Sequence, residues 1–468
     1  MTPPCAGTAG AQERDKLTGV QVARRTFLSS MAASVLAQQA GRPRPNFIII
    51  YTDDQGIGDA GCYGAKDVRT PNIDRLAAEG ARFTDWYSNS PVCSPSRASL
   101  LTGKYPERTG IIDVLESRAT FDVPGLRRGE SSLPGELRKL GYRTALVGKW
   151  HLGSASHSRP MSQGFDEFFG FYSGWIDGLS HRYYKLGTAK SQIFHDLWYN
   201  DAEIWREPEY HTDLFSRTAA EWVAKRGSKP FLLYLAFGAP HYPMIAPQRC
   251  LDRFPETMDR DRRMHAAMLA AVDDGVGRLL EQLRRSGINR NTVVFFQSDN
   301  GATQEERADH LARPYGGGSN APFRGYKMGL FEGGIRMPAL MRWPGVIAPG
   351  TVVNEPGMAM DIAPTFLKWA GGAMPAGIDG GDVSEMISSG ARSPHEAIFW
   401  MYKDQRAVRR GKWKLIENPP SFAGEPVSDK LWLSNLADDP GEKRNWASES
   451  PDVVKELSAM LSARKAQS

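Results

Sequence analysis

The feature that most constrains the fold is a pattern that recurs four times, an apolar segment that runs directly into polar residues. The four segments span residues 46–52, 142–148, 230–237 and 291–297. Continuous apolar runs of this length are typical of strands that are buried on both faces of a parallel sheet. Between them, apolar residues recur at helical spacing in residues 134–140, 214–225 and 262–285. The alternation predicts an α/β fold with a mostly parallel central sheet flanked by helices.

Side chains that can bind metal ions or transfer protons follow each of these predicted strands. In chain order they are Asp53, Asp54, Lys149, His151, His241, Asp299 and Asn300. In open α/β sheets, ligands bind in the crevice beyond the carboxyl ends of the strands. We therefore expect the four strand ends to converge on one active site, built by residues that lie far apart in the sequence.

A reactive cysteine lies in a further segment, residues 91–103. Cys93, Pro95 and Arg97 form a Cys-x-Pro-x-Arg motif, which is followed by a run able to form a helix. Cys93 would then lie near the helix N-terminus, where unpaired backbone N–H groups favour an anion, with Arg97 about one turn later. The motif predicts a nucleophile beside an anion-binding cation. For an isolated cysteine, a buried structural thiol is the usual alternative.

Four residues at the ends of predicted strands carry the oxygen ligands that a hard divalent cation prefers: Asp53, Asp54, Asp299 and Asn300. Such ligands suit Ca²⁺ or Mg²⁺, and no cluster of soft ligands argues for zinc. Taken singly, an acidic residue after a strand is more often a turn residue or a helix cap. Together with Cys93, the four residues predict a metal site.

Fixed cations and two histidines complete the predicted site. Arg97, Lys149 and Lys327 lie near strand ends or glycine turns, where a positive charge can stabilise negative oxygen. His151 and His241 can transfer protons near neutral pH. The alternatives for single residues of these types are a solvated surface lysine and a structural histidine. The position of both histidines at the ends of predicted strands favours a catalytic role for them.

Residues 93–104 closely resemble the signature of the type I sulfatases, in which the cysteine is oxidised to formylglycine. Residues 53–54, 148–153, 298–301 and 324–327 are similar to further motifs of this family, which belongs to the alkaline phosphatase superfamily. The resemblance, of the arylsulfatase and N-acetylgalactosamine-6-sulfatase kind, covers nearly the whole chain after the first forty residues. It implies an alkaline-phosphatase-like fold, usually a Ca²⁺ ion, and hydrolysis of an aryl or carbohydrate sulfate.

The resemblance also implies roles for the residues around the nucleophile. Hydrated formylglycine at Cys93 would attack sulfur, held by Lys149 and Arg97 and deprotonated with the help of Asp299. The metal ligands would be Asp53, Asp54, Cys93, Asp299 and Asn300.

The remaining roles concern the substrate. Lys327 would bind the sulfate, and His241 would protonate the leaving alcohol. His151 would take a proton from the remaining hydroxyl of the hydrate as sulfate leaves. Ser173 resembles an additional serine of the family, within a looser match. The resemblance thus implies substrate contacts from Lys149, Ser173, His241 and Lys327.

The first forty residues resemble a twin-arginine export signal followed by a linker. Arg24 and Arg25 precede a weakly apolar run at residues 28–37, which ends in small or apolar residues suited to cleavage. An amphipathic N-terminal helix is the alternative. No later segment supplies the ~18 apolar residues of a membrane span. We expect an exported, periplasmic protein whose partners are the twin-arginine translocase and a formylglycine-generating enzyme.

The C-terminal part of the chain follows a different pattern. Short apolar segments at residues 397–401 and 413–416, followed by an amphipathic run at 452–464, predict a small antiparallel sheet with a closing helix. We assign residues 41–352 to a catalytic domain and residues 353–468 to a C-terminal α+β subdomain. The net charge of +5 is too mild to indicate a nucleic-acid partner.

Residues 154–209 interrupt the strand and helix pattern with many aromatic and histidine residues. We interpret this region as an irregular insertion near the cleft, whose rings would stack on a sugar or aryl group or would cover the sheet edge. Cys62 and Cys250 could form a disulfide, but we expect two free thiols.

Two other functions stay open at this point. A formylglycine-dependent phosphonate or phosphodiester hydrolase is one, because fold likeness alone does not fix the reaction. A noncatalytic protein that binds sulfated glycans is the other, although paired histidines beside a metal and a nucleophile argue against it. The expected substrate is a sulfated small molecule or a sulfated glycan, with a sulfated hexosamine as one hypothesis. The sequence leaves the oligomeric state open.

Overall fold

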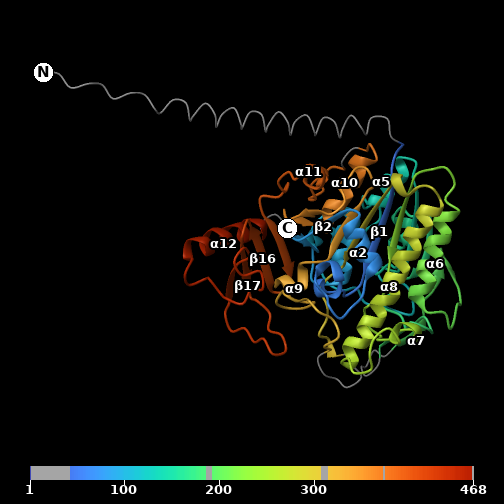
Figure 1. Cartoon of the computed structure of the whole chain (residues 1–468), viewed down its shortest axis with the longest axis horizontal. Helices are drawn as coiled ribbons and strands as arrows, with labels where there is room; N and C mark the ends of the chain where they lie inside the picture. The colour runs from blue at the N-terminus through green and yellow to red at the C-terminus, as the bar shows by residue number, and fades with distance from the viewer. Residues whose placement is uncertain (2–42, 186–191, 307–314, 373–374, 466–468) are drawn as a thin grey trace.

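A ten-stranded mixed sheet forms the centre of the computed structural model (Figure 1), with the strand order β13-β2-β12-β11-β1-β10-β4-β5-β8-β9. The structure describes Met1 and residues 43–185, 192–306, 315–372 and 375–465, so the expected export signal lies outside the described residues. The four predicted strands are neighbours, and all are parallel. They are β11 (Thr292–Ser298), β1 (Asn46–Thr52), β10 (Phe231–Ala236) and β4 (Arg143–Lys149). The predicted parallel centre of the sheet is therefore confirmed.

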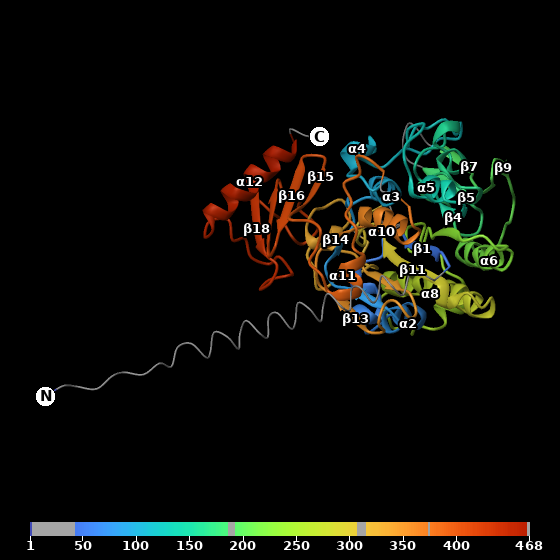
Figure 2. The ribbon, with the colours of Figure 1, turned by 90° about the horizontal axis from the view of Figure 1, so that it is seen from above.

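Helices cover both faces of the sheet, as Figure 2 shows from above. Every residue of β1 is buried, and its side chains alternate between two cores. One core contains α2 (Pro71–Ala78), α6 (His211–Ala224) and α8 (Arg260–Arg285). The other contains α3 (Cys93–Thr102), α5 (Leu133–Lys139) and α10 (Ile362–Trp369). This two-sided burial explains why the central strands are continuous apolar runs.

Residues 154–209 are not an irregular insertion, and that expectation is wrong. β5 (Glu167–Phe171) extends the sheet parallel to β4, and two short antiparallel strands follow it, β8 (Trp198–Tyr199) and β9 (Ala202–Glu203). A separate hairpin joins β6 (Arg182–Lys185) to β7 (Gln192–His195). Strands of two residues have no periodicity, so their pairing leaves no local signal in the sequence.

A four-stranded antiparallel sheet forms the C-terminal subdomain, as predicted. Its strands are β15 (Ile398–Tyr402), β16 (Gln405–Arg410), β17 (Trp413–Glu417) and β18 (Leu431–Asn435). The closing helix α12 (Pro451–Lys465) packs on this sheet through Leu457 and Leu461. By contrast, α10 and α11 (Ser384–Ser389) lie beyond residue 352 but pack in the core of the central sheet.

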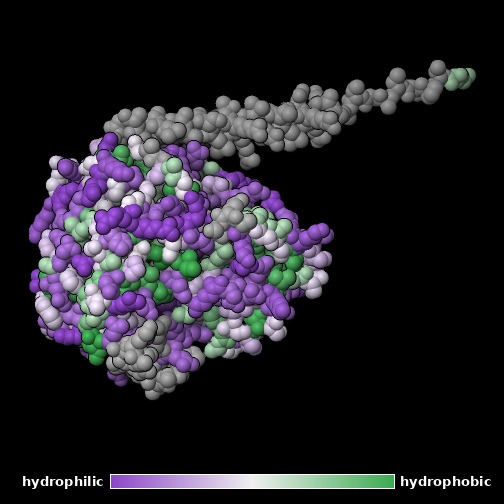
Figure 3. Space-filling view, turned by 180° about the vertical axis from the view of Figure 1, so that it is seen from behind, coloured by the Kyte–Doolittle hydropathy of each residue, from purple (hydrophilic) through white to green (hydrophobic). Residues whose placement is uncertain are grey.

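The remaining strands form one end of the central sheet or a separate two-stranded pair. They are β2 (Ala81–Phe83), β12 (Ala339–Arg342), β13 (Thr351–Val353), β3 (Trp86–Tyr87) and β14 (Gly357–Met358). The remaining short helices are α4 (Pro106–Thr109), α7 (Gln248–Leu251) and α9 (Glu332–Ile335). Within the described ranges, no helix has the length and apolar character needed to cross a membrane. The face shown in Figure 3 is predominantly hydrophilic.

Candidate active site

The carboxyl ends of the parallel strands meet at one place, and the structure brings together the residues that follow them. Asp53 and Lys149, which follow β1 and end β4, are 2.5 Å apart between Oδ2 and Nζ. Asp54 and Asn300 are joined by a hydrogen bond of 2.7 Å from Nδ2 to Oδ1. All eleven predicted site residues are at most 5% exposed. The four strand ends therefore converge on one site, as the sequence predicts.

Cys93 is the first residue of α3, and the whole of this helix is buried. Burial raises the pKa of Cys93 to about 12, although Lys149 and Lys327 oppose the shift. The thiol is therefore neutral near pH 7 and is a poor thiolate nucleophile. Arg97, one turn later, donates from Nη2 to Asp299 Oδ2 at 2.7 Å. The helix thus carries both the reactive position and a fixed cation.

The two lysines each contact a different carboxylate. Lys149 pairs with Asp53, while Lys327 Nζ lies 2.9 Å from Asp54 Oδ2 and 3.2 Å from Glu305 Oε2. Burial opposes the charge of Lys327, but these two carboxylates outweigh it and raise its pKa. Sequence reasoning missed Glu305, since it lies in a loop without any motif. The lysines bring two positive charges to the buried cluster around Cys93.

Unpaired oxygens in this cluster fit a divalent metal ion. Among the described residues, Asp53 Oδ1 and Asn300 Oδ1 are buried without a hydrogen-bond partner. Asp53, Asp54, Cys93 and His241 each offer a ligand atom, and these atoms lie within 4.8 Å of one another. Burial and the nearby Asp299 raise the pKa of Asp53 to about 8 against the pull of Lys149. A hard cation would satisfy the oxygens and stabilise the carboxylate charge.

Both oxygens of Asp299 have partners, as do both oxygens of Asp54. Asp299 Oδ2 accepts from Arg97, and Asp299 Oδ1 accepts from the Asp54 backbone N–H at 3.2 Å. Burial opposes the charge of Asp299, but Arg97 and Lys149 outweigh burial and lower its pKa. Asp299 is therefore a fixed anion between Asp54 and Arg97.

Backbone hydrogen bonds set the tautomers of the two histidines. His151 Nε2 lies 3.1 Å from the Leu115 carbonyl oxygen, so Nε2 carries the proton and Nδ1 is an acceptor. Burial and Lys149 hold the pKa of His151 well below its usual range, which keeps the ring neutral. His241 Nδ1 donates to the Tyr242 carbonyl at 2.7 Å, and its Nε2 lies 3.7 Å from Asp54 Oδ2.

The backbone is strained at several of these turns. Asp54, His151 and Met328 have φ values of 63°, 53° and 73°, a left-handed region that non-glycine residues rarely adopt. Gly148 has a φ of 113°, and a Cβ atom there would lie 1.9 Å from the Ala236 carbonyl oxygen. Strain of this kind gathers where a site requires one particular orientation of a side chain.

Ser173 lies beside the site but does not bond to the cluster. Its hydroxyl donates to the Trp175 carbonyl at 2.9 Å, and its backbone N–H donates to Asp196 at 2.8 Å. Trp175 is near the site, with its ring 6.0 Å from that of His241, but Tyr183 packs against it at 4.5 Å. The aromatic residues of this region therefore pack largely on one another.

Comparisons with known proteins agree with this geometry. The sulfatase family model matches residues 45–373, and the model for the C-terminal part of N-sulphoglucosamine sulphohydrolase matches residues 326–467. Arylsulfatase J of Mus musculus is 32% identical over 91% of this chain and 76% of its own length. N-acetylgalactosamine-6-sulfatase of Mus musculus is 35% identical over 84% of this chain and 75% of its own.

Solved structures lead to the same family. The crystal structure of Ps i-CgsB has a TM-score of 0.80 and 31% identity, and it covers 90% of this chain and 92% of its own. The same protein has been solved in complex with k-i-k-neocarrahexaose. The family matches span most of the chain, from β1 to the C-terminal helix. The chain therefore belongs to the type I sulfatases of the alkaline phosphatase superfamily, and it is a sulfatase.

Proposed function

We propose that this sulfatase cleaves a carbohydrate sulfate by means of formylglycine formed from Cys93, with Ca²⁺ as the preferred metal and Mg²⁺ as the alternative. The observation that carries the proposal is the placement of Cys93. It begins a buried helix beside two lysines and the oxygen cluster, yet its thiol has a pKa of about 12. A thiol that stays neutral is unsuited to attack by itself, whereas a hydrated aldehyde at the same position offers hydroxyl oxygens.

The metal would be held by Asp53, Asp54, Asp299 and Asn300, together with an oxygen of the modified residue 93. A bound divalent cation supplies charge that offsets the negative sulfate and favours ionisation of a neighbouring hydroxyl. The unpaired oxygens of Asp53 and Asn300 support this assignment. Oxygen ligands favour Ca²⁺ or Mg²⁺ over softer metals.

The protein side chains would then position the reactants and move the protons. Lys327 and Lys149 hold the sulfate and the nucleophile, since both ammonium groups lie beside the cluster. Asp299, kept ionised by Arg97, helps to accept the proton of the attacking hydroxyl. Both steps place charge where it develops in the transition state.

The histidines would act on the two departing groups. His241, next to Asp54, donates a proton to the oxygen of the leaving alcohol as the sulfur–oxygen bond breaks. His151 takes a proton at Nδ1 from the remaining hydroxyl of residue 93, which restores the aldehyde as sulfate leaves. The Leu115 carbonyl supports this role because it keeps the proton of the ring on Nε2.

Replacement of the nucleophile tests this proposal. Cys93→Ala should reduce the hydrolysis of p-nitrophenyl sulfate to background, while Cys62→Ser should leave it unchanged. Peptide mass spectrometry of the wild-type chain, coexpressed with a formylglycine-generating enzyme, should find an aldehyde or its hydrate at residue 93. Undiminished turnover by Cys93→Ala would contradict the proposal. Faster cleavage of an aryl phosphonate than of the sulfate would favour a phosphonate hydrolase instead.

We also propose that the natural substrate is a sulfated glycan. Relatives support this choice, because one is named for a sulfated N-acetylgalactosamine and another was solved with a carrageenan-type oligosaccharide. Release of sulfate from a panel of sulfated oligosaccharides, measured by ion chromatography, is the test. Cleavage of aryl sulfates with no release from any glycan would count against this part of the proposal.

Finally, we propose export to the periplasm through the twin-arginine translocase. The support is the pair Arg24 and Arg25 ahead of a weakly apolar run. Maturation in the cytoplasm by a formylglycine-generating enzyme would then precede export of the folded chain. Replacement of both arginines by lysine should leave the protein in the cytoplasmic fraction, and unchanged periplasmic recovery would contradict the proposal.

A further inference from the structure

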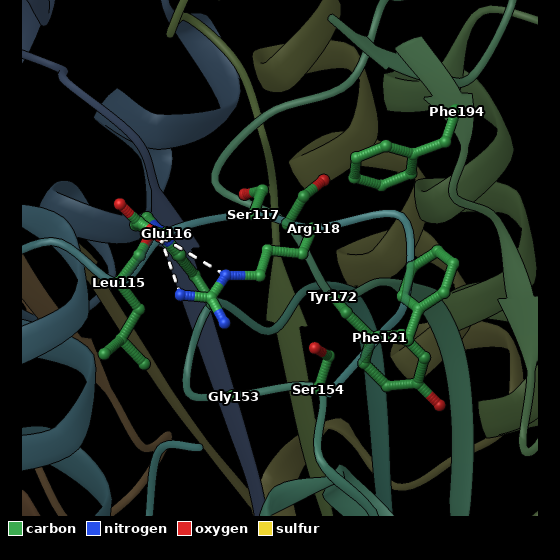
Figure 4. A pocket seen from close by; sticks show the side chains of 11 residues that line it. Leu115, Glu116, Ser117, Arg118, Phe121, Gly153, Ser154, Tyr172 and Phe194 are labelled. Carbon is green, nitrogen blue, oxygen red and sulfur yellow. Dashed lines mark hydrogen bonds and ion pairs between the residues drawn. The ribbon is translucent and has the colours of Figure 1, made fainter. Parts of the chain in front are cut away.

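A small pocket beside His151 has no role in the mechanism above. Its cavity volume is only about 10 Å³, close to the space that one water molecule needs, and the pocket opens to solvent. The pocket lies between the loop at residues 115–121 and the segments that contain Ser154 and Tyr172, as Figure 4 shows. A substituent of a sugar would therefore enter from the solvent side as the exposed side chain of Arg118 turns.

The pocket is joined directly to the reacting centre. The Leu115 backbone N–H donates to Ser94 Oγ at 3.1 Å, which ties the loop to the residue after Cys93. The Leu115 carbonyl accepts from His151, whose ring also lines the pocket. Ser117 Oγ accepts from the Gly174 N–H at 3.1 Å, which fixes the turn next to Ser173. A group in this pocket would therefore lie next to the site of sulfate cleavage.

Two hydroxyl groups of the lining can donate into the pocket. Ser117 Oγ and Ser154 Oγ each accept a backbone N–H, from Gly174 and Val123, at 3.1 Å. A hydroxyl that accepts in this way still has its proton to donate. Both serines are buried, at 8% and 6% exposure, so their positions are fixed by the protein.

Aromatic rings form the opposite wall. The ring of Phe121 meets those of Phe194, Trp198 and Tyr172 edge-on, with centroids 5.3, 5.0 and 6.0 Å away. Such edge-to-face contacts hold the wall rigid. An apolar wall opposite a few directed donors is the usual composition of a small-ligand site.

Arg118 and Glu116 are the oppositely charged residues of the pocket lining, and Figure 4 shows the side chain of Arg118 extended across the pocket. Its Nε and Nη2 donate to a single oxygen of Glu116, at 3.3 and 3.0 Å. In the described part of the chain, Nη1 has no hydrogen bond. The two side chains are 50% and 57% exposed, and ion pairs with such exposure contribute little stability. The guanidinium can therefore turn to another anion at small cost.

We propose that this pocket, the Arg118 pocket, binds a second anionic group of the substrate, a sulfate or a carboxylate. It is defined by Ser117, Arg118, Phe121, His151, Ser154 and Phe194. The inference rests on the proposed sulfatase function and narrows it to glycans that carry a further negative group close to the sulfate that is cleaved. Arg118 and the two serine hydroxyls recognise the anion, and the aromatic wall bounds the sugar that carries it.

Steady-state kinetics with matched substrates test the proposal. The substrates are p-nitrophenyl sulfate, a neutral monosulfated disaccharide, its disulfated form, and a monosulfated disaccharide with a uronate. Arg118→Gln should lower kcat/KM for the dianionic substrates about 10- to 100-fold, mainly through KM. Its effect on the other two substrates should stay within about threefold. Arg118→Lys should recover part of the loss, and Arg392→Gln, at a side chain that is 93% exposed, should lose nothing.

Binding to the Cys93→Ala chain separates recognition from catalysis. Calorimetry should show that the Cys93→Ala chain binds the disulfated disaccharide and the uronate disaccharide more tightly than the Cys93→Ala, Arg118→Gln double variant does. A response to only one of these ligands would identify the anion and support the proposal. Equal losses of kcat/KM on all four substrates would assign Arg118 a structural role and overturn the proposal. The absence of a loss on every substrate would also overturn it. A wild-type enzyme that is inactive but binds dianionic glycans through Arg118 would contradict the proposed catalytic mechanism and leave the Arg118 pocket standing.

Discussion

Two buried charge clusters of this protein have the same composition but differ in how completely they are paired. The active-site cluster consists of Asp53, Asp54, Arg97, Lys149, Asp299 and Lys327. The second, which we call the interface cluster, joins α9 and β16–β17 and consists of Asp85, Glu332, Arg336, Arg409, Lys414 and Glu442. Each contains three carboxylates and three cations, and none of the twelve residues is more than 9% exposed.

The interface cluster is closed. Lys414 lies 2.9 Å from Glu332 and 3.2 Å from Glu442, and Arg336 bridges Glu332 to Asp85. Within the described ranges, no buried polar side-chain atom of this cluster lacks a hydrogen-bond partner, whereas Asp53 Oδ1 and Arg97 Nη1 do. A closed cluster holds two parts of a fold together, and an incomplete one is poised for a ligand. The difference between the clusters thus separates structure from function.

The largest expected effect comes from one substitution made in both clusters. Asp53→Asn should lower kcat by at least about 1,000-fold, because it removes a charge from the metal site. Its free energy of unfolding should change by less than about 1 kcal/mol, since the amide oxygen can still accept from Lys149. Asp85→Asn should do the reverse, with lower stability and near-normal kcat. Stopped assays measure kcat, and urea unfolding measures the free energy of unfolding. Equal changes in the two variants would contradict the proposed difference between the clusters.

Opening the interface cluster should give the next largest effect. Lys414→Met leaves Glu332 and Glu442 buried without their shared cation, which should cost about 3 kcal/mol of stability. Turnover per folded molecule should stay within about threefold of wild type. The matched control is Lys412→Met, because that lysine is exposed on the turn that precedes β17. A loss of turnover larger than the loss of folded protein would place the cluster in the catalytic machinery.

Acid should open the interface cluster by a smaller amount. Burial opposes the charge of Glu332, but Lys414 and Arg336 outweigh it and lower its pKa from 4.5 to about 2. A lowered folded-state pKa gives stability that is present above pH 4.5 and lost as the pH falls towards 2. The stability difference between wild type and Glu332→Gln should shrink by about 2 kcal/mol from pH 6 to pH 3. A constant difference over this range, in urea unfolding, would contradict the assignment.

Much of the fold was predictable because its signals are local. The run at residues 46–52 is β1 with the same bounds, and α12 begins one residue before the predicted helix. β5, β8 and β9 escaped prediction, since their pairing depends on neighbours distant in the chain and two of them have only two residues. Local periodicity therefore predicts the centre of the sheet better than its edges.

The site shows the same division. Residues at strand ends or in motifs, such as Asp53 and Cys93, could be identified from the sequence, and the structure brings them together. Glu305, Asp196 and Leu115 could not be identified, because they act through a carboxylate or carbonyl that only the folded loops bring close. No spacing in the sequence encodes such contacts.

The metal content of the purified protein tests the central claim most directly, namely that the incomplete cluster is a metal site. Inductively coupled plasma mass spectrometry of dialysed samples, with turnover measured on the same samples, should find about one equivalent of a divalent cation, calcium, per wild-type chain. Asp53→Asn should lose most of it, and Asp85→Asn should retain it. A metal-free wild-type chain that hydrolyses sulfate esters at full rate would contradict the claim.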